Sequence, residues 1–271
     1  MRVIDKPWSK EEVISMGKKP NSHCNNYGGN LLTTFDPNVF GSYHFADGAY
    51  VYYFYKAKDQ EEIVINELKS FSVLFYKGDA KTVINIANQN KNIKCNDTIQ
   101  VENSSLRIKV DGGNVDLLIA GIRQSSISDS SLRITKYEKI KKVSKPWGYE
   151  LWINGEHPGY AIKKIHIHAG FRTSLQYHDI KRETNVLLEG NANLYFKSNK
   201  NIMDDIVKDS NISMVNIKAS TIIDIMPKVL HRIESISDIV LCEVSTPYLN
   251  DVIRVSDDRN RKNGRIEDEH K

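Results

Sequence analysis

The sequence predicts an all-β protein with little helix, built from two successive β domains. Short runs rich in Val, Ile, Tyr and Phe, such as AYVYYFYK and VDLLIAGI, alternate with Gly, Asn and Asp, as in β-sandwiches and barrels. A length of 271 residues is enough for two domains of ordinary size, each with an apolar core.

The elements of the first half follow in order. A helix-start signal lies in SKEEVISMG at 9–17, where Ser9 would be the N-cap and Glu12 follows at capping-box spacing. After it we expect strands in the β-rich runs 49–56, 62–68, 70–77, 81–87, 106–110 and 115–122.

The second half repeats the first in a looser sense. Aligning Gly78 with Gly190 sets SFSVLFYKGDA over RETNVLLEGNA, and KPW at 6–8 matches KPW at 145–147. The polar, Ser- and Lys-rich stretch between the halves is typical of a linker, and the last residues are densely charged. We therefore predict a first β-domain at 1–124, a linker at 125–144, a second barrel at 145–258 and a charged tail at 259–271.

The second half carries four residues of metal-ligand type. Gln176 and His178 are two apart, so on a strand both side chains project from one face. Glu183 would return from the next turn or strand, and the distant His231 would supply the fourth ligand. Imidazole nitrogen with carboxylate and amide oxygen suits a divalent ion, zinc first, with manganese, iron, cobalt and nickel as alternatives. Open coordination positions would make such a site catalytic.

In this alignment, the first half has other residues at the four ligand positions. It sets Val64 opposite Gln176, Asn66 opposite His178, Phe71 opposite Glu183, and Leu106 or Arg107 near His231. Since Val and Phe would fill the centre of a barrel, we predict a packed first domain without a metal.

Two segments of the second half resemble the conserved motifs of a known family. GFRTSLQYHDIKRETNVLLEG at 170–190 resembles the first motif of the cupins, with Gln in place of the usual first His, and MPKVLHRIE at 226–234 resembles the second. Cupins are double-sheet barrels of jelly-roll type, so the resemblance implies two cupin-type barrels, bicupin-like, of which the first is degenerate.

Residues 144 to 260 most resemble the type II mannose-6-phosphate isomerase domain. The matching segments are KPWGYE at 145–150, YAIKKIHIHAGFRTSLQYH at 160–178 and DVIRVSDD at 251–258. The second motif departs from the pattern, because it is one residue short before His231 and lacks a Gly. The resemblance implies a metal-dependent aldose–ketose isomerase of sugar phosphates, in polysaccharide or nucleotide-sugar biosynthesis.

An isomerase also needs a general base. His166 and His168 share one strand face, while Ile165 and Ile167 take the other. Either histidine would be a base if the polar face lined the barrel mouth. The alternative is a solvent-facing polar strand with its isoleucines in the core.

Fixed cations would bind the sugar phosphate, and arginine suits phosphate oxygens. The candidates are Arg172, which precedes the ligand strand, Arg254 in the closing motif, and Lys163, which matches the family's lysine. Arg254 is also a candidate for a catalytic role.

Charge and apolar content argue against nucleic-acid-binding and membrane proteins. The net charge is +4 with both signs interspersed, so we expect no nucleic-acid partner. No apolar run approaches the roughly 20 residues of a membrane span, and the amino terminus lacks signal-peptide features, so we expect a cytoplasmic protein. A homodimer fits barrels with open edges. Two other functions stay open: a non-catalytic cupin that binds a sugar or sugar nucleotide, and a metal-dependent oxygenase or decarboxylase.

Overall fold

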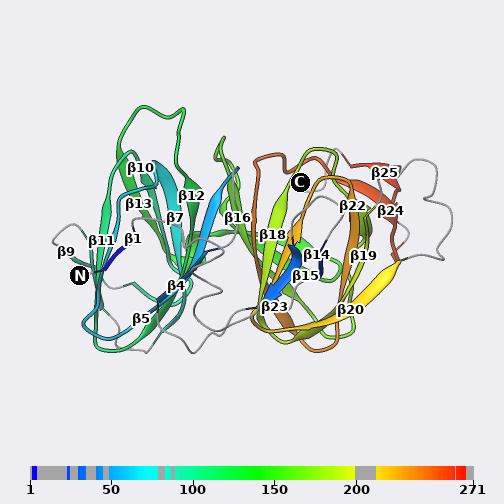
Figure 1. The fold of residues 1–271 in the computed structure, drawn as a ribbon, viewed down its shortest axis with the longest axis horizontal. Coiled ribbons are helices and arrows are strands. Elements are labelled where there is room, and N and C mark those ends of the chain that lie inside the picture. Colours follow the sequence, from blue (N-terminus) through cyan, green and yellow to red (C-terminus); the bar gives the residue numbers. More distant parts are fainter. Residues whose placement is uncertain are drawn as a thin grey trace. The chain divides into compact units, whose positions relative to one another are not determined.

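A computed structural model describes residues 2–4, 23–24, 30–34, 41–44, 49–78, 83–86, 89–91, 93–198, 212–259 and 261–266. The helix predicted at 9–17 and the first KPW lie outside these residues. Among the described residues the regular structure is β apart from one short 3-10 turn, Tyr137–Lys139, which confirms the all-β class (Figure 1). No helix in this part of the chain has the length and apolar character needed to cross a membrane.

The described residues form two compact units. Unit 1 consists of the described residues within 1–19, 36–141 and 157–160. Unit 2 consists of those within 20–35, 142–156 and 161–271. The predicted boundaries treat the halves as successive segments, whereas two early strands belong to unit 2 and a short segment of the second half belongs to unit 1. The predicted linker also contains two strands, Ser131–Thr135 and Lys141–Lys145.

Unit 1 holds two sheets among the described residues, in the orders β1-β6-β11-β8-β9 and β13-β10-β7-β12-β5-β4. All six predicted strand runs of the first half are present. The strands are β1 (Arg2–Ile4), β4 (Gly41–His44), β5 (Val51–Ala57), β6 (Glu62–Ile65), β7 (Ser70–Gly78), β8 (Val83–Ile86), β9 (Gln89–Lys91), β10 (Thr98–Glu102), β11 (Leu106–Asp111), β12 (Val115–Ile122) and β13 (Ser131–Thr135).

Unit 2 also holds two sheets, in the orders β14-β15-β16-β23-β18-β21-β3-β2 and β20-β19-β22-β17-β24-β25. The strands are β2 (His23–Cys24), β3 (Asn30–Thr34), β14 (Lys141–Lys145), β15 (Gly148–Asn154), β16 (Ala161–Ile167), β17 (Leu175–Tyr177), β18 (Glu183–Glu189), β19 (Asn191–Ser198), β20 (Ser213–Lys218), β21 (Thr221–Ile225), β22 (Val229–Ser235), β23 (Ile239–Ser245), β24 (Ile253–Ser256) and β25 (Gly264–Arg265).

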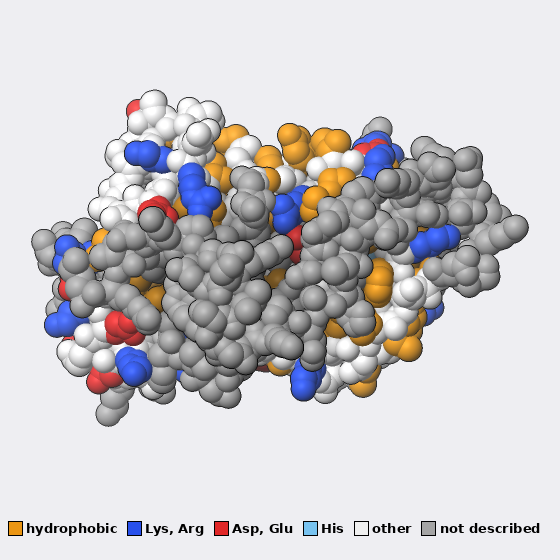
Figure 2. Space-filling view, in the orientation of Figure 1, with side chains coloured by type: hydrophobic (Ala, Val, Ile, Leu, Met, Phe, Trp, Pro, Cys, Tyr) orange, Lys and Arg blue, Asp and Glu red, His pale blue; other side chains and the backbone are white. Residues whose placement is uncertain are grey.

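The two units share a strand order, as the internal repeat predicts. The run β10-β7-β12-β5 of unit 1 corresponds to β21-β18-β23-β16 of unit 2, and β6-β11-β8 corresponds to β17-β22-β19. All of these pairings are antiparallel. Inward and outward side chains alternate along each strand. In Figure 2 the described Lys and Arg side chains lie scattered among other residue types on the visible face.

The interior of unit 1 is apolar where unit 2 carries polar groups. Phe71, predicted to lie opposite Glu183, is fully buried in the core. Val64 corrects the alignment, because it is half-buried while its neighbours Ile63 and Ile65 fill the core. A one-residue slip in register exchanges the faces of a strand, so the alignment predicts the wrong face for Val64.

Candidate metal centre

Three of the predicted ligands meet inside unit 2. His178, Glu183 and His231 offer ligand atoms that all lie within 4.8 Å of one another. His178 Nε2 lies 3.3 Å from Glu183 Oε2, and His231 Nε2 lies 3.4 Å from Glu183 Oε1. The three residues are buried, so the cluster is part of the barrel interior.

Strand pairing explains why residues far apart in sequence converge. Gln176 on β17 lies directly opposite His231 on β22, and opposite residues of an antiparallel pair share a face. On β22 the flanking Val229 and Ile233 belong to the apolar core, so His231 between them faces inward too. Glu183 is the first residue of β18 and is buried with them.

The Nδ1 atom of each imidazole is held by a backbone carbonyl. His178 Nδ1 donates to the carbonyl of Asp251, and His231 Nδ1 donates to the carbonyl of Val229 at 3.0 Å. In the neutral form of each ring, the lone pair of Nε2 then lies on the side of Glu183, which is the tautomer that ligates a metal. Burial, and then the charge of Lys181, lower the pKa of His178, which favours the neutral ring.

One atom in this cluster lacks a partner. The Nε2 of His178 is buried and makes no hydrogen bond to the described residues. Buried polar atoms are rarely left in this state, and a cation between His178 and Glu183 would satisfy it. The residues present thus fit a divalent metal.

Gln176 completes the predicted donor set. It is half-buried, lines the same cavity, and its Oε1 accepts a hydrogen bond from Ser174 Oγ at 2.8 Å. Two nitrogens with carboxylate and amide oxygens suit zinc, manganese, iron, cobalt or nickel.

The cavity at the cluster has a volume of about 70 Å³. It is lined by four buried charged side chains, of which only Lys163 is among the predicted site residues: Glu150, Lys163, Lys181 and Glu243. Lys181 Nζ lies 2.5 Å from Glu183 Oε2 and 2.8 Å from Glu243 Oε1. The signals available were the position of Lys181 two residues before Glu183, and a lone Glu243 in the otherwise apolar run IVLCEV.

These charges set one another's ionisation. Burial opposes the charge on Lys181, but the Glu183 and Glu243 carboxylates outweigh burial and raise its pKa above the ordinary value. Burial likewise opposes the charge on Glu183, while Lys181 and then His178 hold its pKa well below the usual range. The centre therefore contains the ionised carboxylate of Glu183 in contact with the ammonium group of Lys181.

The general-base candidates lie elsewhere. Ile165 and Ile167 of β16 line the cavity, and His166 and His168 project from the other face of that strand. His166 is half-buried and stacks on Tyr149 with ring centroids 5.1 Å apart, while His168 is exposed. The alternative interpretation, a polar outer face with core isoleucines, describes this strand, and neither histidine lines the inner cavity.

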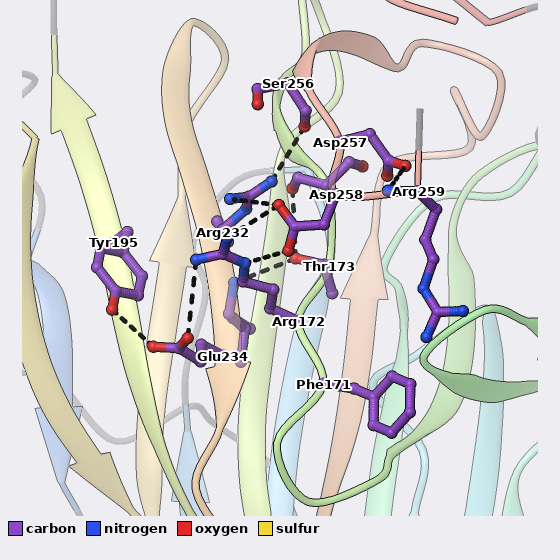
Figure 3. Close-up of polar contacts among 12 residues, drawn as sticks. Phe171, Arg172, Thr173, Tyr195, Arg232, Glu234, Ser256, Asp257, Asp258 and Arg259 are labelled. Carbon is purple, nitrogen blue, oxygen red and sulfur yellow. Dashed lines mark hydrogen bonds and ion pairs between the residues drawn. The ribbon is translucent and has the colours of Figure 1, made fainter. Parts of the chain in front are cut away.

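Arg172 also lies outside the cavity. Its guanidinium makes a two-pronged contact with the carboxylate of Asp258, and its Nη1 lies 3.7 Å from Glu234 Oε1 (Figure 3). Arg232, on the outward side of β22, lies 3.5 Å from the same Asp258. Arg172, Glu234 and Asp258 line a separate hollow of about 530 Å³, together with Phe171. The guanidinium of Arg172 already binds the Asp258 carboxylate, which argues against its predicted role in binding the substrate phosphate.

The other two predicted cations lie nearer the cluster. Lys163 lines the cavity, with Nζ 3.4 Å from Glu150 Oε2. Arg254 on β24 lies opposite Gln176, is buried, and donates from Nη1 to the carbonyl of Lys262 at 2.9 Å.

Comparisons with known proteins identify the fold. No family model matches the sequence, and no curated protein is detectably similar to it. Among solved structures, the oxalate decarboxylase of Lactobacillus farciminis, in complex with formate, is 12% identical with a TM-score of 0.58, over 86% of this chain and 90% of that chain. An IolB-like protein of Salmonella typhimurium LT2 is 12% identical with a TM-score of 0.61, over 82% of this chain and 94% of that one.

A third structure, the quercetin 2,3-dioxygenase of Acinetobacter baumannii, is 10% identical with a TM-score of 0.54, over 78% of this chain and 82% of that one. These neighbours are cupin-fold proteins. At such identities the likeness is one of fold, and it shows the all-β double jelly roll of the cupins, here with a candidate metal centre in unit 2.

Proposed function

We propose that the protein is a metal-dependent cupin enzyme whose centre is formed by Gln176, His178, Glu183 and His231. The observation that carries the proposal is the convergence of two imidazole Nε2 atoms on one carboxylate, 3.3 and 3.4 Å away, while backbone carbonyls fix both Nδ1 atoms. This arrangement costs free energy without a cation and is stabilised by one.

The reaction we propose is the interconversion of an aldose and a ketose phosphate, which the segments at 145–150 and 251–258 favour. A bound divalent ion would polarise the sugar carbonyl as a Lewis acid. The isomerisation moves a proton from one of the two reacting carbons to the other, and a second proton moves between their two oxygens. Glu243 is the carboxylate placed to hold the proton that moves between the carbons, and Lys181, 2.8 Å away, orients this carboxylate.

The size of the cavity limits how the substrate binds. About 70 Å³ holds only a few water-sized groups, so the cavity takes the carbonyl end of the sugar and the phosphate lies nearer the mouth. Lys163 and Arg254 supply the positive charge on this side of the barrel. Arg172 pairs with Asp258 outside this cavity.

Two other functions have specific support. The small cavity with two buried lysines also suits a small carboxylate, as an oxygenase or decarboxylase would bind, and two of the fold neighbours are an oxalate decarboxylase and a dioxygenase. The contact of Lys181 with Glu183 also suits a non-catalytic barrel that binds a sugar, because an ammonium group already balances the carboxylate.

The test combines metal content with turnover. We expect the purified full chain to retain about one equivalent of divalent metal at the inner centre, H178A to lose it, and the distant control R172Q to keep it. A coupled assay of mannose 6-phosphate conversion to fructose 6-phosphate then tests the isomerase. Metal without turnover on hexose, pentose or heptose phosphates contradicts it, and oxygen consumption or decarboxylation of oxalate would support the second function instead. We also propose that the chain forms a homodimer, which light scattering of the same sample tests.

A further inference from the structure

A second group of ligand-type residues lies on the outer face of unit 2. His166 and His168 project from the outward face of β16 and its end, and Asp238 lies in the connection between β22 and β23. Each offers one ligand atom, and these atoms all lie within 4.8 Å of one another. The two imidazole rings are 4.8 Å apart and meet at 70°.

The surroundings hold these groups in place. His166 stacks on Tyr149 at an interplanar angle of 8°, and the Oδ1 of Asp238 accepts a hydrogen bond from the amide of Ala169 at 2.7 Å. The backbone of Asp238 packs on Gly190, where φ is +85° and a Cβ would lie 2.3 Å from the Asp238 carbonyl. Glycine at this turn lets the connection approach the end of β18, so Asp238 has a defined position.

His166 has a further feature that points to a ligand. Its Nδ1 is buried and makes no hydrogen bond within the described part of the chain. An imidazole with one nitrogen unsatisfied, beside a second imidazole and a carboxylate, is a donor set with vacant capacity.

We propose that His166, His168 and Asp238 form a second, outer site for a divalent transition metal such as zinc. Two imidazoles and one carboxylate match the preference of zinc, nickel or copper and lack the oxygen donors that calcium and magnesium need. His168 and Asp238 are exposed, so their side chains have room to rotate slightly onto the ion, and water can supply further ligands. The ion would tie the end of β16 to the β22–β23 connection.

This site is independent of the inner centre. Ile165 and Ile167, which line the inner cavity, lie on the opposite face of β16 from His166. A variant of one site therefore leaves the ligands of the other untouched.

The experiment titrates zinc into the chelator-treated full chain by calorimetry. We expect H168A, and separately D238N, to weaken outer binding at least about tenfold and to leave the inner site unchanged. H178A, which removes an inner ligand, keeps the outer site, and D129N is the control for an exposed aspartate elsewhere. Loss of the inner site in H178A is scored separately, so failure of either proposal is visible without the other.

A second measurement guards against misfolding. In the H178A background, zinc should raise the melting temperature, and adding H168A should abolish that rise while the metal-free melting temperature stays the same. The proposal is overturned if H168A and D238N bind zinc with the stoichiometry and affinity of the unmodified chain, or if D129N weakens binding as much as they do.

Discussion

Lys181 and Glu243 form an ion pair inside unit 2, with Nζ 2.8 Å from Oε1 and both residues buried. The same ammonium group lies 2.5 Å from Glu183, the carboxylate on which both imidazoles converge. A metal ion at this cluster would therefore share Glu183 with a lysine, and the two cations repel each other.

Replacing Lys181 with Met tests this competition. Without metal, K181M leaves Glu183 and Glu243 buried and unpaired, so we expect the free energy of unfolding to fall by about 3–5 kcal/mol. Zinc should bind K181M at least about tenfold more tightly than the unmodified chain, because the repulsion is gone. Urea unfolding and calorimetry measure both. K139M, at an exposed lysine, is the control, and weaker zinc binding by K181M would contradict the idea.

Glu183→Gln tests the carboxylate with little change of shape. The amide keeps a hydrogen-bond acceptor for Asn185, which now donates to Glu183 Oε1 at 3.1 Å, but it loses the charge that both imidazoles face. We expect zinc affinity at the inner centre to fall at least about a hundredfold with the far-UV circular dichroism unchanged. Retained affinity in E183Q would mean that the ion binds elsewhere.

Arg172→Gln should have small effects. The side chains of Arg172 and Asp258 are 38% and 40% exposed, and ion pairs at such exposure contribute about 0–1 kcal/mol to stability. Since Arg172 borders a different hollow from the metal cluster, KM for a phosphorylated substrate should not change, whereas K163M should raise it. A large rise in KM with R172Q would restore its role in phosphate binding.

Much of the fold and the shared face of Gln176 and His178 could be predicted from sequence because both follow from local spacing, whereas the prediction of His231 depends on the resemblance of 226–234 to the second cupin motif. Alternating apolar residues predict strands, and residues two apart share a face, which holds for His178 in its motif and for Ile165 and Ile167 on β16. The same rule cannot decide which face of β16 is inside, and in the structure Ile165 and Ile167, not His166, line the cavity.

The errors involve partners that are distant in sequence. Arg172 is neutralised by Asp258, 86 residues away, and no local pattern predicts that pairing. Lys181 and Glu243 were missed because buried charges are rare, and only the assembled barrel brings them together. Val64 was misplaced because β-strands align with one another almost equally well one residue apart.

His157 in unit 1 should make stability depend on pH. Its Nδ1 accepts the amide of Gly159 at 3.0 Å, so its Nε2 carries the hydrogen and donates to Ser70 Oγ at 2.8 Å, which describes a neutral ring. Burial lowers its pKa below the ordinary 6.5, although Glu102 opposes the shift. The unfolded chain therefore takes up this proton at a higher pH than the folded one. The stabilising contribution is complete above about pH 6.5 and is lost as the pH falls from there through the folded-state pKa.

We expect urea unfolding to give a lower free energy of unfolding at pH 5.5 than at pH 7.5. In H157Q the amide can replace both hydrogen bonds but does not titrate, so the fall between the two pH values should be smaller. H23Q changes another histidine and is the matched control for composition. An equal fall in H157Q and in the unmodified chain would show that other groups cause the pH dependence.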